Sequence, residues 1–379
     1  MTKILVIDGD VITRRAIAQI LQEKTQHQIV INGESNRAVE HIIEAEPDLL
    51  LLGISPDSVE EIAQLSTIKI RFPNLSVIIL SERSEPGAAV VIAALRLGAV
   101  DFITKSENFC SMLFAERHLT KRLIPIVEAS LRANHGMREG TMSQSFEKDL
   151  TSIWPLNLIT IGGCTGGPAA LFKLIETLPK NFNIPIVAVQ HLPKYYTKVL
   201  AARLDEVSDL EVREATDGVV LNGGGVWIAP GGFHSEVHRD GNETVLKVHK
   251  GPREHDARPS IDMLFRSAGR LYGPGAMGVI LSGCGKDGVA GAGAIKQAGG
   301  HVLVQDISTS LMPDLPLAVV KTGYCDIISP TEQMVQHFLK RDKGAVRPYA
   351  EAEIKKREIS PTGYSEFRYL DKHLFSTLN

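Results

Sequence analysis

Two successive alternations of short apolar runs and helix-length segments constrain the fold of this chain of 379 residues. In the first alternation, the run "DLLLLGI" is the kind of continuous apolar strand that a parallel sheet buries on both faces. Strands that alternate with helices pair in parallel, so the pattern predicts a doubly wound parallel sheet. The predicted strands are 4–7, 29–32, 49–52, 77–80 and 101–104. The predicted helices are 14–23, 36–46, 59–72, 88–97 and 119–132.

A second and larger alternation follows "NHGMREGTMSQSFEKDLTS", a stretch without apolar period that is typical of a linker. Its predicted strands are 158–161, 186–190, 226–229, 245–249, 278–282 and 301–305. Its predicted helices are 168–177, 197–205, 261–268, 289–298 and 316–321. We therefore predict an α/β protein of two domains, the second also doubly wound around a parallel sheet. The predicted divisions are a first domain over 1–132, a linker over 133–154, a second domain over 155–342 and a charged tail over 343–379.

Composition and charge exclude several classes of protein. The formal net charge of −3 gives no basis for a nucleic-acid or membrane-surface partner. The cysteines are scattered without a Cys-x-x-Cys spacing, so neither a disulfide framework nor a zinc site is expected. Asp8 and Asp10 interrupt the only apolar run near the N-terminus, which argues against a signal peptide, and no run reaches membrane-spanning length. We expect a cytoplasmic protein without membrane insertion, and no motif calls for a cofactor.

Three polar residues follow strands of the second domain, at the edge where open α/β sheets bind ligands. Cys164 follows "LITIG", His191 follows "IVAVQ" and Asp287 follows "VILSGCGK". A thiol, an imidazole and a carboxylate are the parts of a nucleophile, base and orienter triad. Taken singly, they have structural interpretations: a small buried thiol, a core histidine and a helix N-cap. Because all three follow strands at the same edge of the sheet, we favour a functional site over three separate structural roles.

The turn "ITIGGCTGGPAAL" suits a nucleophile at its tip. Its glycines permit a sharp change from strand to helix, and Pro168 is suited to the first helical turn, where no amide hydrogen is needed. Cys164 would then lie just before a helix N-terminus, which lowers the pKa of a thiol and leaves amides free to stabilise an oxyanion. A phosphate cradle is the alternative, although "GGCTGG" does not fit G-x-G-x-x-G.

Five blocks occur in order between Leu156 and Ile328: "IGGCTGGPAAL", "VAVQHLP", "WIAPGGFH", "RPSIDMLFRSA" and "VILSGCGKDGVAGAGAIKQAGG". Together they resemble the signature blocks of the chemotaxis protein-glutamate methylesterases. The resemblance implies hydrolysis of γ-glutamyl methyl esters on methyl-accepting chemoreceptors and deamidation of selected receptor glutamines. It implies chemoreceptors, and other chemotaxis signalling proteins, as partners.

The same resemblance assigns roles position by position. Cys164 stands where the family has its nucleophilic serine, while His191 and Asp287 match its histidine and aspartate. Thr165 matches the adjacent threonine, and Cys284 corresponds to the methionine whose amide helps to form the oxyanion hole. At neutral pH a thiolate is a stronger nucleophile than a serine hydroxyl. Sulfur is larger than oxygen, however, so in a site shaped for serine the attacking atom can lie out of position.

Four blocks of the first domain, "ILVIDGDVITRRAIAQIL", "EPDLLLLGISPD", "VIILSER" and "GAVDFITKS", resemble a response-regulator receiver, a flavodoxin-like domain. The resemblance implies a phosphorylation site in which two acidic residues hold Mg²⁺, a hydroxyl and a lysine complete the site, and an aspartate accepts the phosphoryl group. The matching residues are Asp8 and Asp10 for the acidic pair, Ser81 for the hydroxyl, Lys105 for the lysine and Gly53 for the acceptor.

Glycine at position 53 has no side chain, so an acyl phosphate cannot form there. Mg²⁺ also loses a ligand, which leaves at most weak binding at Asp8 and Asp10. Ser55 and Asp57 lie nearby but out of register with the strand end. We interpret the domain as a pseudo-receiver retained for packing on the second domain or for docking a partner.

Three functions follow from the sequence. The first is an esterase with a Cys-His-Asp triad. The second is a catalytically lapsed homologue that acts as a docking or regulatory protein, because both the nucleophile and the phosphoacceptor differ from the family. The third, a nucleotide-binding protein, rests on the glycine turn alone. Arg258 and His234 are candidates for contacting an acidic receptor segment.

Overall fold

The structure, a computed structural model, describes residues 2–56, 58–105, 112–134 and 156–341. The two predicted α/β domains contact each other through their described residues and belong to one compact unit. Beyond Asn134 the predicted linker lies outside the described residues, as does the predicted tail. Within the described part of the chain, no helix is both long enough and apolar enough to cross a bilayer.

The first domain is a five-stranded parallel sheet in the order β2-β1-β3-β4-β5. Its central strand β3 is buried along its whole length, as the apolar run predicts. Helices α1 and α5 contact each other, as do α2 with α3 and α3 with α4, so two groups of helices cover the two faces. The strands are β1 Lys3–Ile7, β2 Gln28–Asn32, β3 Leu49–Gly53, β4 Ser76–Ser81 and β5 Asp101–Thr104. The helices are α1 Val11–Lys24, α2 Ala38–Ala45, α3 Val59–Arg71, α4 Glu85–Arg96 and α5 Met112–Asn134.

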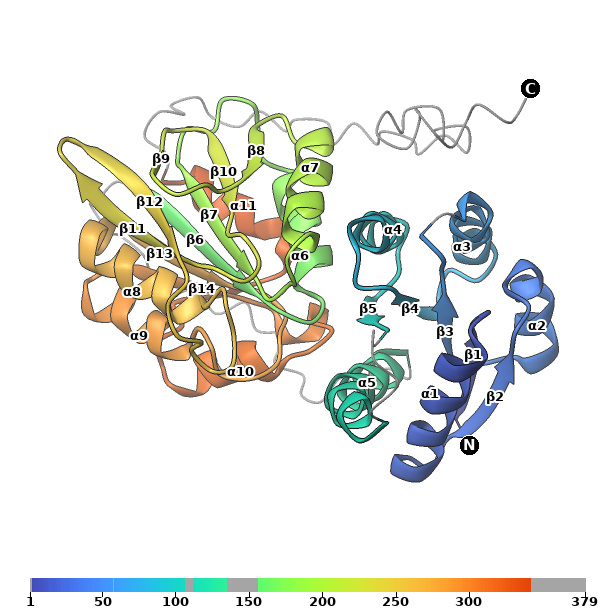
Figure 1. Cartoon of the computed structure of the whole chain (residues 1–379). Helices are drawn as coiled ribbons and strands as arrows, with labels where there is room; N and C mark the ends of the chain where they lie inside the picture. The colour runs from blue at the N-terminus through green and yellow to red at the C-terminus, as the bar shows by residue number, and fades with distance from the viewer. Residues whose placement is uncertain (1, 57, 106–111, 135–155, 342–379) are drawn as a thin grey trace, which may run out of the picture. The chain divides into compact units, whose positions relative to one another are not determined.

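The second domain is built on a seven-stranded parallel sheet in the order β15-β14-β13-β6-β7-β10-β8. Helices α6, α7 and α11 gather on one face, and α8, α9 and α10 on the other (Figure 1). The strands are β6 Leu158–Gly163, β7 Ile186–Gln190, β8 Glu211–Glu214, β10 Gly225–Ile228, β13 Ala276–Ile280, β14 His301–Gln305 and β15 Ile327–Ser329. The helices are α6 Gly167–Ile175, α7 Tyr196–Val207, α8 Ile261–Tyr272, α9 Val289–Gln297, α10 Asp314–Lys321 and α11 Thr331–Leu339. Both predicted parallel sheets are confirmed.

A small antiparallel sheet in the second domain was not predicted. Its strands are β9 Val219–Val220, β11 His234–Asp240 and β12 Glu243–His249, in the order β11-β12-β9. The predicted strand 245–249 therefore lies in this sheet and not among the parallel strands. Strands β8 and β15 and helix α11 were not predicted either. Only one residue of β8, Val212, is buried, so this edge strand carries little apolar signal.

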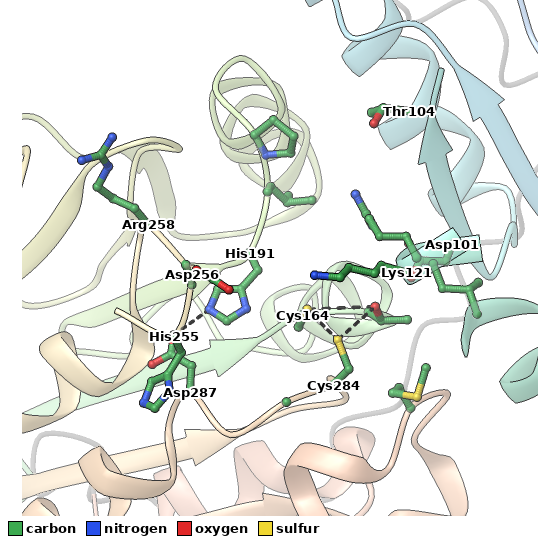
Figure 2. A pocket seen from close by; sticks show the side chains of 18 of the residues that line it. Asp101, Thr104, Lys121, Cys164, His191, His255, Asp256, Arg258, Cys284 and Asp287 are labelled. Atoms are coloured by element: carbon green, nitrogen blue, oxygen red, sulfur yellow. Dashed lines mark hydrogen bonds and ion pairs between the residues drawn. The ribbon is translucent and has the colours of Figure 1, made fainter. Parts of the chain in front are cut away.

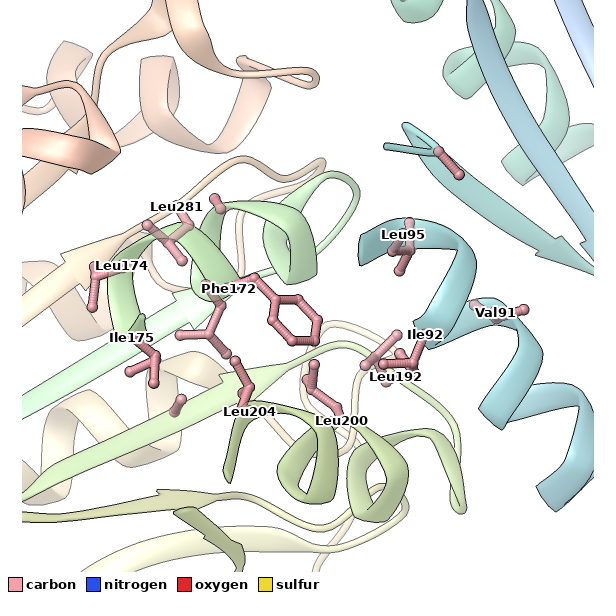
Figure 3. Packing of buried hydrophobic residues seen from close by; sticks show 14 of the residues in the cluster. Val91, Ile92, Leu95, Phe172, Leu174, Ile175, Leu192, Leu200, Leu204 and Leu281 are labelled. Carbon is pink, nitrogen blue, oxygen red and sulfur yellow. The ribbon is translucent and has the colours of Figure 1, made fainter. Parts of the chain in front are cut away.

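The two domains share one apolar core. Helix α4 contacts both α6 and α7. Figure 3 shows Ile92 and Leu95 of α4 facing Phe172 of α6 and Leu200 of α7. The cluster continues into both sheets, so burial of these side chains stabilises the contact between the domains through the hydrophobic effect.

Candidate active site

Cys164 lies in the turn between β6 and α6. Its N–H donates to the Ser282 carbonyl at 3.0 Å, and its own carbonyl accepts the Gly167 N–H at 2.9 Å. Gly166 is the N-cap of α6 with φ of +74°, a left-handed conformation that glycine adopts without strain. Pro168 lies in the first turn of the helix, as predicted. The thiol is therefore held beside the positive end of α6.

His191 and Asp287 lie in direct contact. His191 follows β7, and its N–H donates to the Gly163 carbonyl at 3.1 Å, which fixes it next to the turn that carries Cys164. Its Nε2 lies 2.8 Å from Asp287 Oδ2. In Figure 2 the opposite edge of the imidazole ring faces Cys164. The three side chains therefore come together from residues far apart in the sequence, as the shared sheet edge predicts.

Asp287 orients the site through four hydrogen bonds. Besides His191, its carboxylate accepts the N–H groups of Ile261 at 2.8 Å and Asp262 at 2.9 Å, and the Ser260 hydroxyl at 2.8 Å. These donors belong to the N-terminus of α8, whose N-cap is Ser260, and Asp287 is buried. Asp287 therefore binds α8 and is not the N-cap of α9, whose N-cap is Gly288.

The proton affinities of these groups favour an ion pair. The hydrogen bond from Cys284 lowers the pKa of the Cys164 thiol well below its usual value; burial opposes this, and His191 adds to it. Burial alone would lower the pKa of His191, but Asp287 and Cys164 outweigh it and raise that pKa to about 10. Burial alone would raise the pKa of Asp287, but the hydrogen bond with His191 keeps it below its usual value. The arrangement favours a thiolate beside an imidazolium.

Cys284 and Thr165 complete the surroundings of the sulfur. Cys284 Sγ lies 3.6 Å from Cys164 Sγ, and Thr165 Oγ1 lies 4.0 Å from each sulfur (Figure 2). Cys284 is exposed, whereas Cys164 is half-buried and Thr165 is buried. The contact with Cys164 raises the pKa of the Cys284 thiol. The two pKa values therefore move apart, and Cys164 has the lower one.

We expect iodoacetamide to alkylate Cys164 faster than any other described cysteine of the reduced protein. Alkylation requires the thiolate, so the rate at Cys164 should persist below pH 7, where a thiol of ordinary pKa (about 8.5) is almost fully protonated. Mass spectrometry of peptides from a time course between pH 6 and pH 8.5 measures each rate. Cys284 is the matched comparison, since it is more exposed but has the higher pKa. Faster labelling of Cys284 or Cys325 than of Cys164 at pH 6 would contradict an activated thiol. Cys110, also expected to react more slowly, lies outside the described residues.

A cavity of about 640 Å³ opens over Cys164, His191 and Asp287. Residues of both domains line it, and many of them are cationic. The cationic residues are Arg83, Lys121 and Arg122 from the first domain, and Lys194, Arg253, Arg258 and Lys286 from the second. Arg258 also donates to the Gly251 carbonyl at 2.8 Å. His234, the other sequence candidate, is fully buried and its Nε2 bonds the Pro252 carbonyl, so it is a structural residue.

Asp101 is a neighbour of the site that the sequence analysis did not identify. From the start of β5 its carboxylate accepts the Gly166 N–H at 3.2 Å, at the N-terminus of α6. Burial raises the pKa of Asp101 to about 6. Nearby, the Tyr196 hydroxyl donates to the Glu82 carbonyl at 2.9 Å, and the ring of Tyr196 stacks on Phe102. No local motif reports this contact, because it depends on how the two domains pack.

The other predicted residues lie at the carboxyl edge of the first sheet. Asp8 is buried, and Lys105 Nζ lies 2.9 Å from its carboxylate. Ser81 ends β4 and is buried, and its hydroxyl lies 3.4 Å from the Gly87 carbonyl. Gly53 ends β3, and a Cβ added there would collide with the Asp8 carboxylate. The Asp8 carboxylate therefore occupies the space in which an acceptor side chain would lie.

These residues do not fit a Mg²⁺ site. Asp10 is the N-cap of α1, and its carboxylate accepts the N–H groups of Ile12 and Thr13 at 3.0 and 3.2 Å and the Thr13 hydroxyl at 2.5 Å. Asp8 is already paired with Lys105, and Gly53 offers no ligand. Mg²⁺ requires several unengaged oxygen ligands in octahedral geometry.

Both domains of the chain are similar in sequence to known protein families. The sequence model of a family described as CheB methylesterase matches residues 159–338, and that of the response regulator receiver domain matches residues 4–114. A protein named protein-glutamate methylesterase/protein-glutamine glutaminase from Trichodesmium erythraeum is 35% identical over 346 residues, which cover 89% of this chain and 98% of the relative. A protein of the same name from Thermotoga maritima is 33% identical over 342 residues, with the same coverage. The crystal structure of the Thermotoga maritima CheB methylesterase catalytic domain is 37% identical, with a TM-score of 0.48, and covers 49% of this chain and 99% of that one.

Proposed function

Because the chain belongs to the protein-glutamate methylesterase/protein-glutamine glutaminase family, with a receiver domain in front of the methylesterase domain, we propose that it hydrolyses γ-glutamyl methyl esters of chemoreceptors with Cys164 as nucleophile. The observation that carries this proposal is the contact of His191 with Asp287 at 2.8 Å beside a thiol of lowered pKa. The alternative, a lapsed homologue that only docks, does not account for a thiol, an imidazole and a carboxylate held together under an open cavity.

The proposed reaction proceeds through a thioester. The Cys164 thiolate attacks the ester carbonyl carbon, and the resulting oxyanion is stabilised at the N-terminus of α6 and by the amide of Cys284. Collapse breaks the bond to the methoxy oxygen, which leaves as methanol with a proton from His191. Water then attacks the thioester while His191 accepts its proton, and glutamate is released. Asp287 holds the imidazole in place and stabilises its charged form. A glutamine side chain would release ammonia by the same steps.

The cavity charge suits the proposed substrate. Arg253, Arg258 and Lys286 lie around the triad, and a receptor segment rich in glutamates would be attracted to them. The test is methanol release from methylated chemoreceptors of the source organism, incubated with the full chain. We expect release that depends on the enzyme; none from any methylated receptor would contradict the proposal.

We further propose that the first domain acts by contact and not by accepting a phosphoryl group. Acetyl phosphate with Mg²⁺ should leave no base-labile phosphate on the protein and should not change the rate of methanol release. The physical reason is that Gly53 offers no carboxylate and Asp8 is paired with Lys105. Phosphate incorporation measured by mass spectrometry checks this.

A receiver domain with an acceptor aspartate, treated in parallel, is the positive control. The variant Gly53→Asp is expected to remain unlabelled, because its new Cβ meets the Asp8 carboxylate. Stoichiometric labelling of the natural protein would refute the interpretation as a pseudo-receiver.

A further inference from the structure

The sulfur atoms of Cys164 and Cys284 lie next to each other at the site, which permits a reaction other than ester hydrolysis. Strands β6 and β13 are neighbours, with Gly162 opposite Ile280, and their two loops continue side by side. The Cys164 N–H donates to the Ser282 carbonyl, which places Cys284 against Cys164 with their sulfurs 3.6 Å apart. A disulfide bond measures about 2.05 Å, so the sulfurs need to approach by only about 1.5 Å.

The loop that carries Cys284 can make this approach. Gly283 and Gly285 flank the residue, and Gly285 has φ of +84° with open space where a side chain would extend. Cys284 is exposed and its side chain borders the cavity, so a small oxidant can reach the pair from solvent. In contrast, Cys325 is buried and its sulfur contacts the Ile327 carbonyl. Among the described cysteines, only Cys164 and Cys284 are placed to react with each other.

The two thiols also have different reactivities. Cys164 is the sulfur that His191 and Cys284 stabilise as a thiolate, and thiolates are the form that reduces peroxides. Cys284 keeps its proton while its negatively charged neighbour is present. Once Cys164 is oxidised its negative charge is gone, and Cys284 can lose its proton more easily. Cys164 is thus suited to be oxidised first, and Cys284 is suited to attack the oxidised sulfur and form the disulfide.

We infer that Cys164 and Cys284 are an oxidation site that reacts with hydrogen peroxide or an organic hydroperoxide to form a disulfide. The Cys164 thiolate attacks one peroxide oxygen and the O–O bond breaks, which leaves a sulfenic acid on Cys164 and releases hydroxide or alkoxide, which takes up a proton. The Cys284 sulfur then attacks the Cys164 sulfur; the S–S bond forms, the S–O bond breaks, and water leaves. In sum, two thiols are oxidised and one peroxide is reduced to water, or to an alcohol and water.

This disulfide occupies the sulfur proposed as the nucleophile, so the oxidised protein cannot form a thioester. A dithiol reductant returns both thiols, which makes the modification reversible. It also protects Cys164, since a sulfenic acid captured by Cys284 is not available for further oxidation to the irreversible sulfinic and sulfonic acids.

The test uses the reduced full chain, hydrogen peroxide, and mass spectrometry of the intact protein and of its non-reduced peptides. The natural protein is expected to lose the mass of two hydrogen atoms, to yield a peptide pair linked through Cys164 and Cys284, and to recover both thiols with dithiothreitol. The variant Cys284→Ser is expected to gain oxygen atoms on Cys164 instead, with recovery of that thiol lower by at least about tenfold. Cys325→Ser is the matched control and should behave as the natural protein does.

These readouts do not depend on esterase activity, so they can fail or succeed separately from the proposed function. Oxygen addition to Cys164 in the natural protein at the same rate and extent as in Cys284→Ser would overturn the inference. So would a disulfide that joins Cys164 to Cys110 or Cys325, or peroxide treatment that oxidises other cysteines and leaves Cys164 reduced.

Discussion

Replacement of Cys164 by alanine is expected to lower the rate of methanol release by at least about 10³-fold, because removal of the nucleophile leaves only binding and oxyanion stabilisation. The change removes one sulfur atom from a half-buried position, so folding should be retained. The measurement is methanol release from a methylated chemoreceptor under saturating and subsaturating substrate. The loss should appear in kcat, since Cys164 is proposed to act on the reacting carbon and not to hold the receptor.

Two matched variants sharpen this result. Cys164→Ser restores the oxygen nucleophile that the resemblance assigns to the family, and should keep activity between those of the natural protein and the alanine variant. Cys325→Ser alters a buried cysteine away from the cavity lining and should keep the rate within about twofold. Retention of more than a tenth of the natural rate by Cys164→Ala would show that another group performs the attack.

Asp287→Asn is expected to lower kcat by about 10² to 10⁴-fold, since an amide of the same size cannot stabilise the imidazolium. The carboxylate raises the pKa of His191, and charged His191 lowers that of Cys164. Without the carboxylate, both pKa values move back towards their usual values, so the thiolate forms at a higher pH. The acid limb of the alkylation rate at Cys164 should therefore shift to higher pH in this variant, which a pH series with iodoacetamide measures.

Ser260→Ala is the control for the structural role of Asp287. It removes one of the four hydrogen bonds to the carboxylate, together with the N-cap bond that Ser260 accepts from the Met263 N–H, without touching the charge of Asp287 or its contact with His191. We expect a loss of stability of about 2 kcal/mol, roughly half from each bond, and little change in the acid limb. A pH profile of Asp287→Asn that coincides with that of the natural protein, in a variant that unfolds at the same temperature, would contradict the role given to Asp287.

The fold was largely predictable because its signal is local. Continuous apolar runs such as β3, and helix-period segments between them, report a parallel sheet wherever they occur in the chain. Strands β8 and β9 were missed because they are short, and β11 was missed because Val237 is its only buried apolar residue. The hydrophobic pattern of such segments is too weak to separate a strand from a loop.

The part of the site that could be predicted consists of the residues that follow parallel strands, because the carboxyl ends of such strands lie at one edge of the sheet. Cys164, His191 and Asp287 each follow a parallel strand, so their shared edge could be inferred before their contacts were known. The bonds of Asp287 to the start of α8 depend on how that helix packs on the sheet. The contact of Asp101 with Gly166 depends on the packing of two domains, for which no sequence period exists. The resemblance assigned Cys284 to the oxyanion hole, but the contact between its sulfur and that of Cys164 follows from the pairing of β6 with β13.

A single turnover is the most direct test of Cys164 as the nucleophile. Excess enzyme is mixed with a receptor segment that carries a labelled glutamyl methyl ester, quenched in acid at successive times, and mapped by peptide mass spectrometry. We expect a labelled, hydroxylamine-sensitive acyl group on the peptide of Cys164, with methanol released in step with it and neither product in Cys164→Ala. An acyl group on another residue, or a full yield of methanol from Cys164→Ala, would contradict this role of Cys164.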